Sequence, residues 1–88
     1  MKHFEFEISG SYDNIDYDYD EYGISYRVGS AGNFTGGAVM SAESYEDAKI
    51  KVVEKIHDEV DGVTEISLVW KEITDVNPEE IEEEFYLE

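Results

Sequence analysis

The 88-residue chain contains no cysteine, a single proline, and only six basic side chains against 23 acidic ones. Without cysteine it can form neither a disulfide framework nor a thiolate metal site. No stretch approaches the roughly 18 consecutive apolar residues of a membrane-spanning helix. The opening residues, 1–5, lack the apolar run of a secretion signal. We therefore expect a cytoplasmic protein that makes no membrane contact.

The shortage of basic residues leaves a formal net charge of −17. Small soluble domains typically carry a net charge of roughly 2–8 in magnitude, and self-repulsion at a higher charge lowers folding stability. Either the acid serves solubility, as it does in saline habitats, or a negative field is part of the function. Direct nucleic-acid binding is disfavoured, because affinity for phosphate backbones comes from lysine and arginine.

What is present is enough for one folded domain spanning residues 1–88. Hydrophobic residues make up 41% of the chain, which is sufficient for one modest core. Apolar and polar residues alternate over 3–9 and 22–28, which is typical of half-buried strands. A further strand is expected over 34–41, after a turn at 29–33 that is rich in glycine. Three consecutive strands with short connections predict an antiparallel meander.

The clearest helix is expected over residues 45–61. Ser44 suits the N-cap, and Gly62 stands where a glycine commonly follows the helix end. Apolar residues follow the helical spacing along one side, and Asp47–Lys51 and Lys55–Glu59 are spaced as ion pairs on the exposed side.

Two glycines and the second half of the chain complete the expected fold. The pair Gly36–Gly37 predicts a bulge or a close approach of the helix. Residues 63–73 are expected to form a strand that is central or partly covered on both faces.

After Asn77 and Pro78, which suit a helix start, the tail favours either a short helix or a frayed acidic end. The order β-β-β-α-β predicts an α+β fold, with about four antiparallel strands and one amphipathic helix on one face.

No set of residues points to catalysis, a metal or a cofactor. His3 and His57 have no serine or buried acid placed to form a nucleophilic triad. Asp16, Asp18 and Asp20 have the spacing that opens a calcium loop, but position 6 of that loop is Glu21 and not glycine, and position 12 is Arg27 and not glutamate. We expect a protein that is not an enzyme.

The acidic residues gather in two segments without a base, 12–22 and 72–88, which hold 13 of the 23. An extended chain over 16–20 would present a row of carboxylates on one side and tyrosines on the other. We predict that these two segments contact a partner. The predicted contact residues are Asp13, Asp16, Tyr17, Asp18, Tyr19, Asp20, Glu21 and Tyr22 in the first segment, and Glu79, Glu80, Glu82, Glu83 and Glu84 in the second.

In size, charge, lack of cysteine and these acidic segments, the chain resembles the small acidic DNA mimics of phages and mobile elements, including anti-CRISPR proteins. The resemblance implies an inhibitor that occupies the basic nucleic-acid-binding surface of a partner, such as a CRISPR effector nuclease. Two alternatives stay open at this point: an acidic interaction module whose charge serves solubility, and a weakly calcium-responsive domain. The sequence leaves a monomer and a small homo-oligomer equally open.

Overall fold

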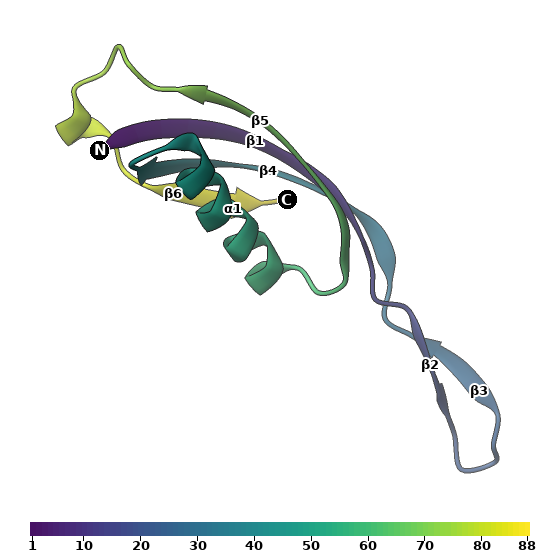
Figure 1. Ribbon diagram of the computed structural model, residues 1–88. Coiled ribbons are helices and arrows are strands. Elements are labelled where there is room, and N and C mark those ends of the chain that lie inside the picture. The colour runs from purple at the N-terminus through teal and green to yellow at the C-terminus, as the bar shows by residue number, and fades with distance from the viewer.

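The computed structural model describes the whole chain, Met1–Glu88 (Figure 1). It contains one α-helix, six strands and a single turn of 3-10 helix. In chain order the elements are β1 (Lys2–Asp13), β2 (Asp16–Tyr19), β3 (Ser25–Val28), β4 (Ala31–Ala42), α1 (Tyr45–Glu59), β5 (Val63–Glu72), the 3-10 turn η1 (Pro78–Glu80) and β6 (Glu84–Leu87).

Four of the strands form the main sheet, in the order β5-β1-β4-β6, and every neighbouring pair is antiparallel. α1 lies against one face of this sheet (Figure 1). The predicted α+β class, with one helix on one face of an antiparallel sheet, is therefore confirmed. α1 is the only α-helix, and it is too short and too polar to cross a bilayer.

The spine of the molecule is one long hairpin. β1 pairs with β4 from Lys2↔Ala42 to Asp13↔Ala31, and β2 continues the pairing with β3 from Asp16↔Val28 to Tyr19↔Ser25. In every one of these pairs the two residue numbers add to 44, so both ladders share one register. The far part of the hairpin, residues 14–30, extends beyond the helix and the other strands (Figure 1). We call it the arm.

The arm makes the molecule elongated, with extents of 63 × 20 × 17 Å. Its radius of gyration is 17.5 Å, whereas a compact domain of this length has about 12 Å. The remainder, which we call the body, contains the hydrophobic core.

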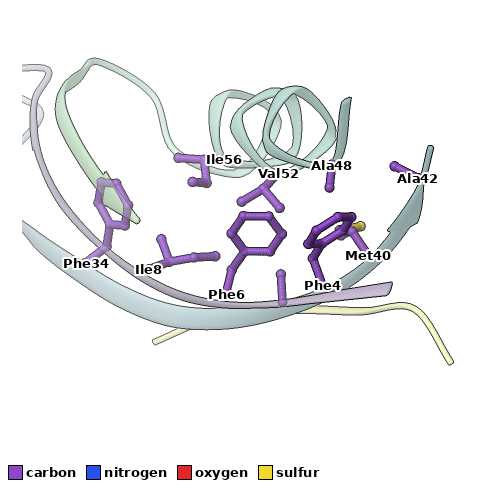
Figure 2. Close-up of a cluster of buried hydrophobic side chains, with 10 residues drawn as sticks. Phe4, Phe6, Ile8, Phe34, Met40, Ala42, Ala48, Val52 and Ile56 are labelled. Atoms are coloured by element: carbon purple, nitrogen blue, oxygen red, sulfur yellow. The ribbon is translucent and has the colours of Figure 1, made fainter. Parts of the chain in front are cut away.

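The core lies between α1 and the curved sheet (Figure 2). Ala48, Val52 and Ile56 recur every four residues on the helix and are fully buried, as the spacing predicts. The sheet contributes Phe4, Phe6, Ile8, Phe34, Ala38, Met40 and Ala42. All the strand members lie in β1 and β4, so the core holds the body and leaves the arm outside.

The ends of α1 form as predicted, but its surface ion pairs do not. The Ser44 side chain accepts a hydrogen bond from the Asp47 backbone N–H, and Gly62 has a φ of 76°, which glycine adopts without strain. The amine of Lys51 lies 3.4 Å from Glu83 and does not pair with Asp47. The helix is therefore tied to the C-terminal segment.

That segment forms neither the short α-helix nor the frayed acidic end between which the sequence left the choice open. The Asn77 side chain caps η1 by accepting from the Glu79 N–H, but the turn ends at Glu80 and the chain then forms β6. Phe85 pairs with Ala38 at the edge of the sheet. Pairing with a ready-made edge satisfies the backbone groups that a short isolated helix would leave to water.

The glycine pair in β4 makes room for this strand. A Cβ at Gly36 would lie 2.1 Å from the Tyr86 carbonyl oxygen, and one at Gly37 would meet the Tyr86 ring. The β1–β4 ladder runs past both glycines without a shift in register. The expected bulge, or approach of the helix, is therefore wrong: the element that approaches is β6.

Three boundaries in the first half of the chain were also predicted wrongly. β1 continues through Gly10 and Ser11, because Gly10 makes room for the Phe34 ring. Residues 22–28 do not join the main sheet but form part of the arm, and the chain reverses at its tip and not at 29–33. The expected meander of three strands is thus one extended hairpin.

β5 is an edge strand and not a central one. Ile66, Leu68 and Trp70 share one face, as predicted, and the first two are half-buried. On the other face no element covers Val69, which is 66% exposed. Val69 is therefore not a core residue, although the sequence suggested that its face would be covered.

Two isoleucines on α1 test this packing. Ile56 is fully buried and Ile50 is 55% exposed, so Ile56→Ala should lower the free energy of unfolding by about 2–5 kcal/mol and Ile50→Ala by less than about 1 kcal/mol. Urea denaturation of both variants measures the difference. Equal losses would contradict the placement of the core.

Candidate binding site: the acidic hairpin arm

The arm begins where the backbone ladder is interrupted for two residues on each strand. The Asn14 N–H donates to the Ser30 carbonyl at 3.0 Å, but the Ser30 N–H donates to the Asn14 side-chain oxygen at 2.7 Å. Gly29, with a φ of 79°, supplies the local change of direction. Because a side-chain oxygen replaces one backbone acceptor, the ribbon can bend here and keep its register.

A loop of the body holds this root in place. The Asp13 N–H donates to the Gly62 carbonyl at 2.9 Å, and the Asn14 side-chain amide donates to the Asp61 carbonyl at 3.3 Å. The Asp13 carboxylate accepts from the Ile15 N–H at 3.1 Å. Contacts between the turn that follows α1 and the start of the arm thus set the direction in which the arm projects.

The tip of the arm is organised by one carboxylate. Asp20 Oδ1 accepts from the N–H groups of Tyr22 and Ile24, each at 2.9 Å, and the Gly23 N–H donates to the Asp20 carbonyl at 3.1 Å. Gly23 has a φ of 77°. A tight turn that ends in a left-handed glycine is a common three-residue hairpin loop, so Asp20 acts as a turn residue.

The register gives the arm two different faces. Asp16 and Asp18 lie opposite Val28 and Tyr26, and continuing the alternation adds Asp20 opposite Ile24. One face therefore carries a row of three carboxylates beside a row of three apolar side chains. We call these the acid row (Asp16, Asp18, Asp20) and the apolar row (Ile24, Tyr26, Val28). The predicted alternation of acids and tyrosines along 16–20 matches this arrangement.

The opposite face of the arm holds its only base. Arg27 lies across from Tyr17, beside Tyr19 and Ser25. The three ion pairs of the molecule, Lys2–Glu72, Lys51–Glu83 and Lys71–Glu5, are all in the body. The negative charge of the acid row is therefore not balanced by any ion pair.

The arm exposes large apolar side chains. Tyr17, Tyr19, Tyr22 and Ile24 are 63–79% exposed, and all eight residues of β2 and β3 are exposed. An isolated two-stranded hairpin is marginally stable in water, so the arm depends on the ladder it continues. Exposed aromatic residues on a projecting ribbon are typical of a contact surface.

The predicted arm residues separate into structural and free ones. Asp13 and Asp20 hold the root and the tip, as described above. Asp16 and Asp18 each accept only from the N–H of the following residue, at 2.8 Å, and Glu21 has no hydrogen-bond partner. Asp16, Asp18 and Glu21 are therefore the arm carboxylates with the most unused bonding capacity.

Ile24, Tyr26 and Val28 were not among the contact residues predicted from the sequence. Their alternation matched that of a strand facing the core, and alternation alone does not say whether a face is covered. No other feature of the sequence distinguishes them from the buried residues of β1.

The second acidic segment lies in the body. Glu79 and Glu80 are in η1, Glu82 follows it, and Glu84 begins β6. η1 lies at the end of the molecule opposite the arm (Figure 1). The two predicted contact sets are therefore not brought together on one surface.

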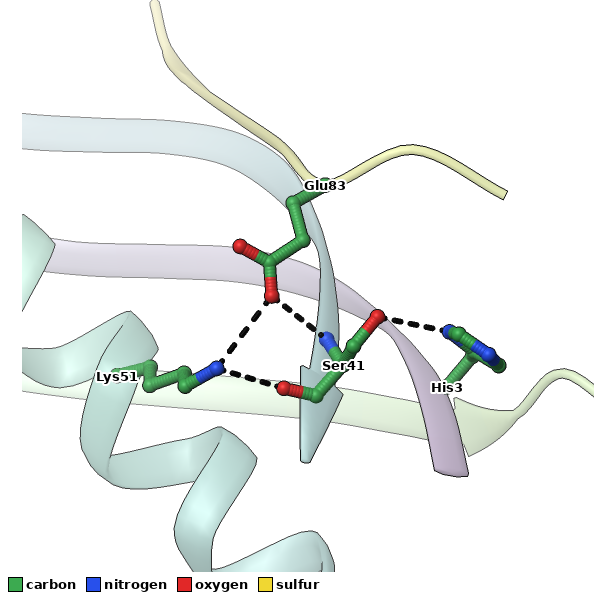
Figure 3. A network of polar contacts seen from close by, with 4 residues as sticks. All are labelled: His3, Ser41, Lys51 and Glu83. Atoms are coloured by element: carbon green, nitrogen blue, oxygen red, sulfur yellow. Dashed lines mark hydrogen bonds and ion pairs between the residues drawn. The ribbon is translucent and has the colours of Figure 1, made fainter. Parts of the chain in front are cut away.

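Glu83 forms contacts within the chain. It accepts from the Ser41 N–H at 3.1 Å and lies 3.4 Å from the Lys51 amine, which also donates to the Ser41 carbonyl at 2.7 Å (Figure 3). The hydrogen bond from Ser41 and, after it, the charge of Lys51 lower the pKa of the Glu83 carboxyl. Glu83 thus ties the C-terminal segment to β4 and α1.

The two histidines lie in different elements of the body, His3 in β1 and His57 in α1. His3 Nδ1 is hydrogen-bonded to the Ser41 hydroxyl at 2.8 Å (Figure 3), and His57 is exposed on α1. No three histidine or acidic side chains gather closely enough to hold a metal ion. The arm therefore remains the most distinctive surface.

Comparison with known proteins gave no match to this chain, whether among protein-family models, curated proteins or solved structures.

Glu83 allows a test by pH. Because its pKa is lowered in the folded state, its charge stabilises the fold above the ordinary value of 4.5, and this is lost as the pH falls through the folded pKa. Glu83→Gln should lower stability at pH 7, by less than about 1 kcal/mol since both partners are half-exposed. Thermal melts of this variant and of the wild type should converge at low pH. Glu79→Gln, with the same charge change, is the control, and a Glu83 effect that persists in acid would contradict this role.

Two glycines of the arm have nearly the same φ but different surroundings. A Cβ at Gly29 would lie 2.2 Å from the Asn14 carbonyl oxygen, whereas one at Gly23 meets nothing within 4 Å. Gly29→Ala should disrupt the root of the arm, and Gly23→Ala should cost only about 1 kcal/mol of backbone strain at the tip. Hydrogen exchange should show loss of protection throughout β2 and β3 in the first variant, with the body unchanged. Equal protection in both variants would contradict the described root.

Proposed function

We propose that this protein is a non-catalytic binding protein. Its arm enters a basic, nucleic-acid-binding groove of a partner protein in the cytoplasm and inhibits the partner by excluding nucleic acid. The observation that carries the proposal is the face on which the unpaired acid row runs beside the exposed apolar row.

The acid row supports a basic partner. Proteins that bind nucleic acid line their grooves with lysine and arginine, which attract regularly spaced negative charge. Residues two apart on a strand are about 6–7 Å apart, so Asp16 and Asp18 present a regular series of carboxylates on one edge of the ribbon. Such a series can occupy positions that would otherwise bind phosphates.

The apolar row supports a contact and not only an electrostatic encounter. Charge alone gives fast association but modest affinity, whereas desolvated aromatic side chains provide most of the binding energy in protein interfaces. Tyr26, with Tyr22 at the tip, offers this area close to the carboxylates.

The shape of the arm supports insertion. From the root at residue 14 to the tip at residue 22 the ribbon spans about 26 Å at a rise of about 3.3 Å per residue. A ribbon of two strands is narrow enough to enter the major groove of DNA, which is about 12 Å wide. A protein channel that holds a whole duplex therefore has room for it. CRISPR effector nucleases hold a nucleic-acid duplex in a positively charged channel, which makes them the first partner class to test.

A charge reversal with a matched control tests the proposal. Asp16→Lys/Asp18→Lys reverses the charge of two of the three acid-row residues and leaves the tip and the root unchanged. Glu79→Lys/Glu80→Lys makes the same change in net charge at the far end of the body. With a purified guide-loaded CRISPR effector and a panel of other nucleic-acid-binding proteins as probes, the arm variant should bind at least about tenfold more weakly, and the control within about threefold of wild type.

Competition completes this experiment. Target DNA should displace the wild-type protein, because DNA and the arm would occupy the same basic groove. Binding should also weaken as the salt concentration rises, because salt screens the attraction between opposite charges. Binding to none of the probes, or binding that survives reversal of the acid row, would favour the alternative that the acid serves solubility.

A further inference from the structure

The free edge of β5 carries unpaired backbone groups along one border of the main sheet. β5 pairs only with β1, and Figure 1 shows it at the outer border of the sheet. The Ile73 N–H donates to the His3 carbonyl at 2.8 Å. Because bonded and non-bonded positions alternate along an antiparallel ladder, Ile66, Leu68 and Trp70 direct their N–H and C=O groups away from β1.

The middle of this edge, residues 66–70, lacks the features that usually prevent strand pairing, and the charged residues of β5 stand only on either side of it. β5 is ten residues long, contains no proline, and has its one register shift near Val63, at its very start. Trp70 is 44% exposed even though its ring stacks on Tyr45 at a centroid distance of 4.0 Å. A long edge strand with an uncharged middle is a template for another strand, provided that the charges at its two ends find partners.

The sequence of β5 is complementary to itself around one residue. In an antiparallel pairing of two copies that is centred on Leu68, Glu65 of one copy lies opposite Lys71 of the other, and Ile66 lies opposite Trp70. This centre also joins the outward N–H and C=O groups of the two Leu68 residues, as a hydrogen-bonded pair requires.

The neighbouring two-fold arrangements lack this match. Centring the pairing on Ser67 would place Glu65 opposite Val69, and centring it on Val69 would place Glu65 opposite Ile73. Opposite charges across a strand pair stabilise it, and an unpaired carboxylate beside an apolar residue does not. Charge complementarity therefore selects Leu68 as the centre.

The helix supports the same partner. The two-fold axis of such a pair is perpendicular to the sheet, so both copies of α1 lie on the same face. The outer side of α1 has an apolar hollow next to Tyr45, with Ile50 and Val53 in its lining. Tyr45 stacks on Trp70 of β5, so this hollow adjoins the free edge. A second copy of α1 that approaches across the β5 edge would cover it.

We propose that β5 is the contact strand of a symmetric homodimer, in which residues 65–71 of two copies pair antiparallel around Leu68 and join the two sheets into one. This inference goes beyond the proposed function and does not depend on it. The antiparallel pairing directs the two arms in opposite directions and leaves both of them free.

The experiment is sedimentation equilibrium of the full chain at about 0.5 M NaCl, where the repulsion between two chains of charge −17 is screened within a few ångströms. The wild-type protein should dimerise with a dissociation constant below about 1 mM, which corresponds to weak association. A protein that stays monomeric at all concentrations up to about 1 mM would overturn the proposal.

Charge exchange tests the register. Glu65→Lys breaks no ion pair within the chain and should raise the dimer dissociation constant at least about tenfold, by placing lysine opposite Lys71 in two symmetric positions. Lys71→Glu should raise it at least as much, and it also replaces the exposed Lys71–Glu5 ion pair of the body by two carboxylates. The double variant Glu65→Lys/Lys71→Glu restores opposite charges and should recover the wild-type constant within about threefold.

Two further outcomes would overturn the proposal. One is a dimer that neither single variant weakens, or that the double variant fails to restore. The other is a dimer lost in Asp16→Lys/Asp18→Lys, which would mean that the arms and not β5 join the copies. Circular dichroism confirms that each variant is folded before its association is measured.

Discussion

The single register of the hairpin from Lys2–Ala42 to Tyr19–Ser25 is the constraint on which the rest of the structure depends. It keeps even-numbered positions in line from the body into the arm. In the body these positions carry Phe4, Phe6 and Ile8, which α1 covers. In the arm they carry the acid row and the apolar row. A 15-residue helix is only about 22 Å long, so it cannot cover a ribbon that continues well beyond the body. The same pattern that forms the core therefore becomes an open surface where the helix ends.

This continuity explains what the sequence could and could not predict. The helix was predictable because its cap, its spacing and its final glycine agree at Ser44, Val52 and Gly62. Strand alternation was also predictable, but Ile24 and Tyr26 alternate just as Phe4 and Phe6 do, and only the reach of α1 decides which pair is buried. Glycine was ambiguous for a physical reason. Glycine allows a positive φ in turns, and it allows close packing because it lacks a Cβ. Gly29 is needed for the positive φ and Gly36 for the close approach of β6, and the sequence alone does not distinguish these two roles.

The charge of the chain also acquires meaning only from its arrangement. The arm holds four acids and one arginine, so most of the excess acid lies on the body. What distinguishes the arm is the absence of any ion pair and the apolar row beside the carboxylates. In the body, by contrast, Glu83 binds Ser41 and Lys51 and so contributes to the fold. By the number of acidic residues alone, the C-terminal segment would be the first candidate for a binding site. The arrangement of the side chains makes the arm the better candidate.

The net negative charge favours binding of the arm to a basic partner but opposes the association of two copies of the chain. The fold allows both. Two chains of charge −17 repel each other, yet β5 carries Lys71 where an antiparallel copy presents Glu65, so attraction is local to the contact. Pairing around Leu68 then directs the two arms, which we propose to bind a basic partner, away from each other. Two arms on one rigid sheet would bind two grooves, or two copies of one partner, with an effective concentration set by the sheet and not by diffusion. The long axis of the hairpin would thus determine both where the arm reaches and how far apart two partners are held.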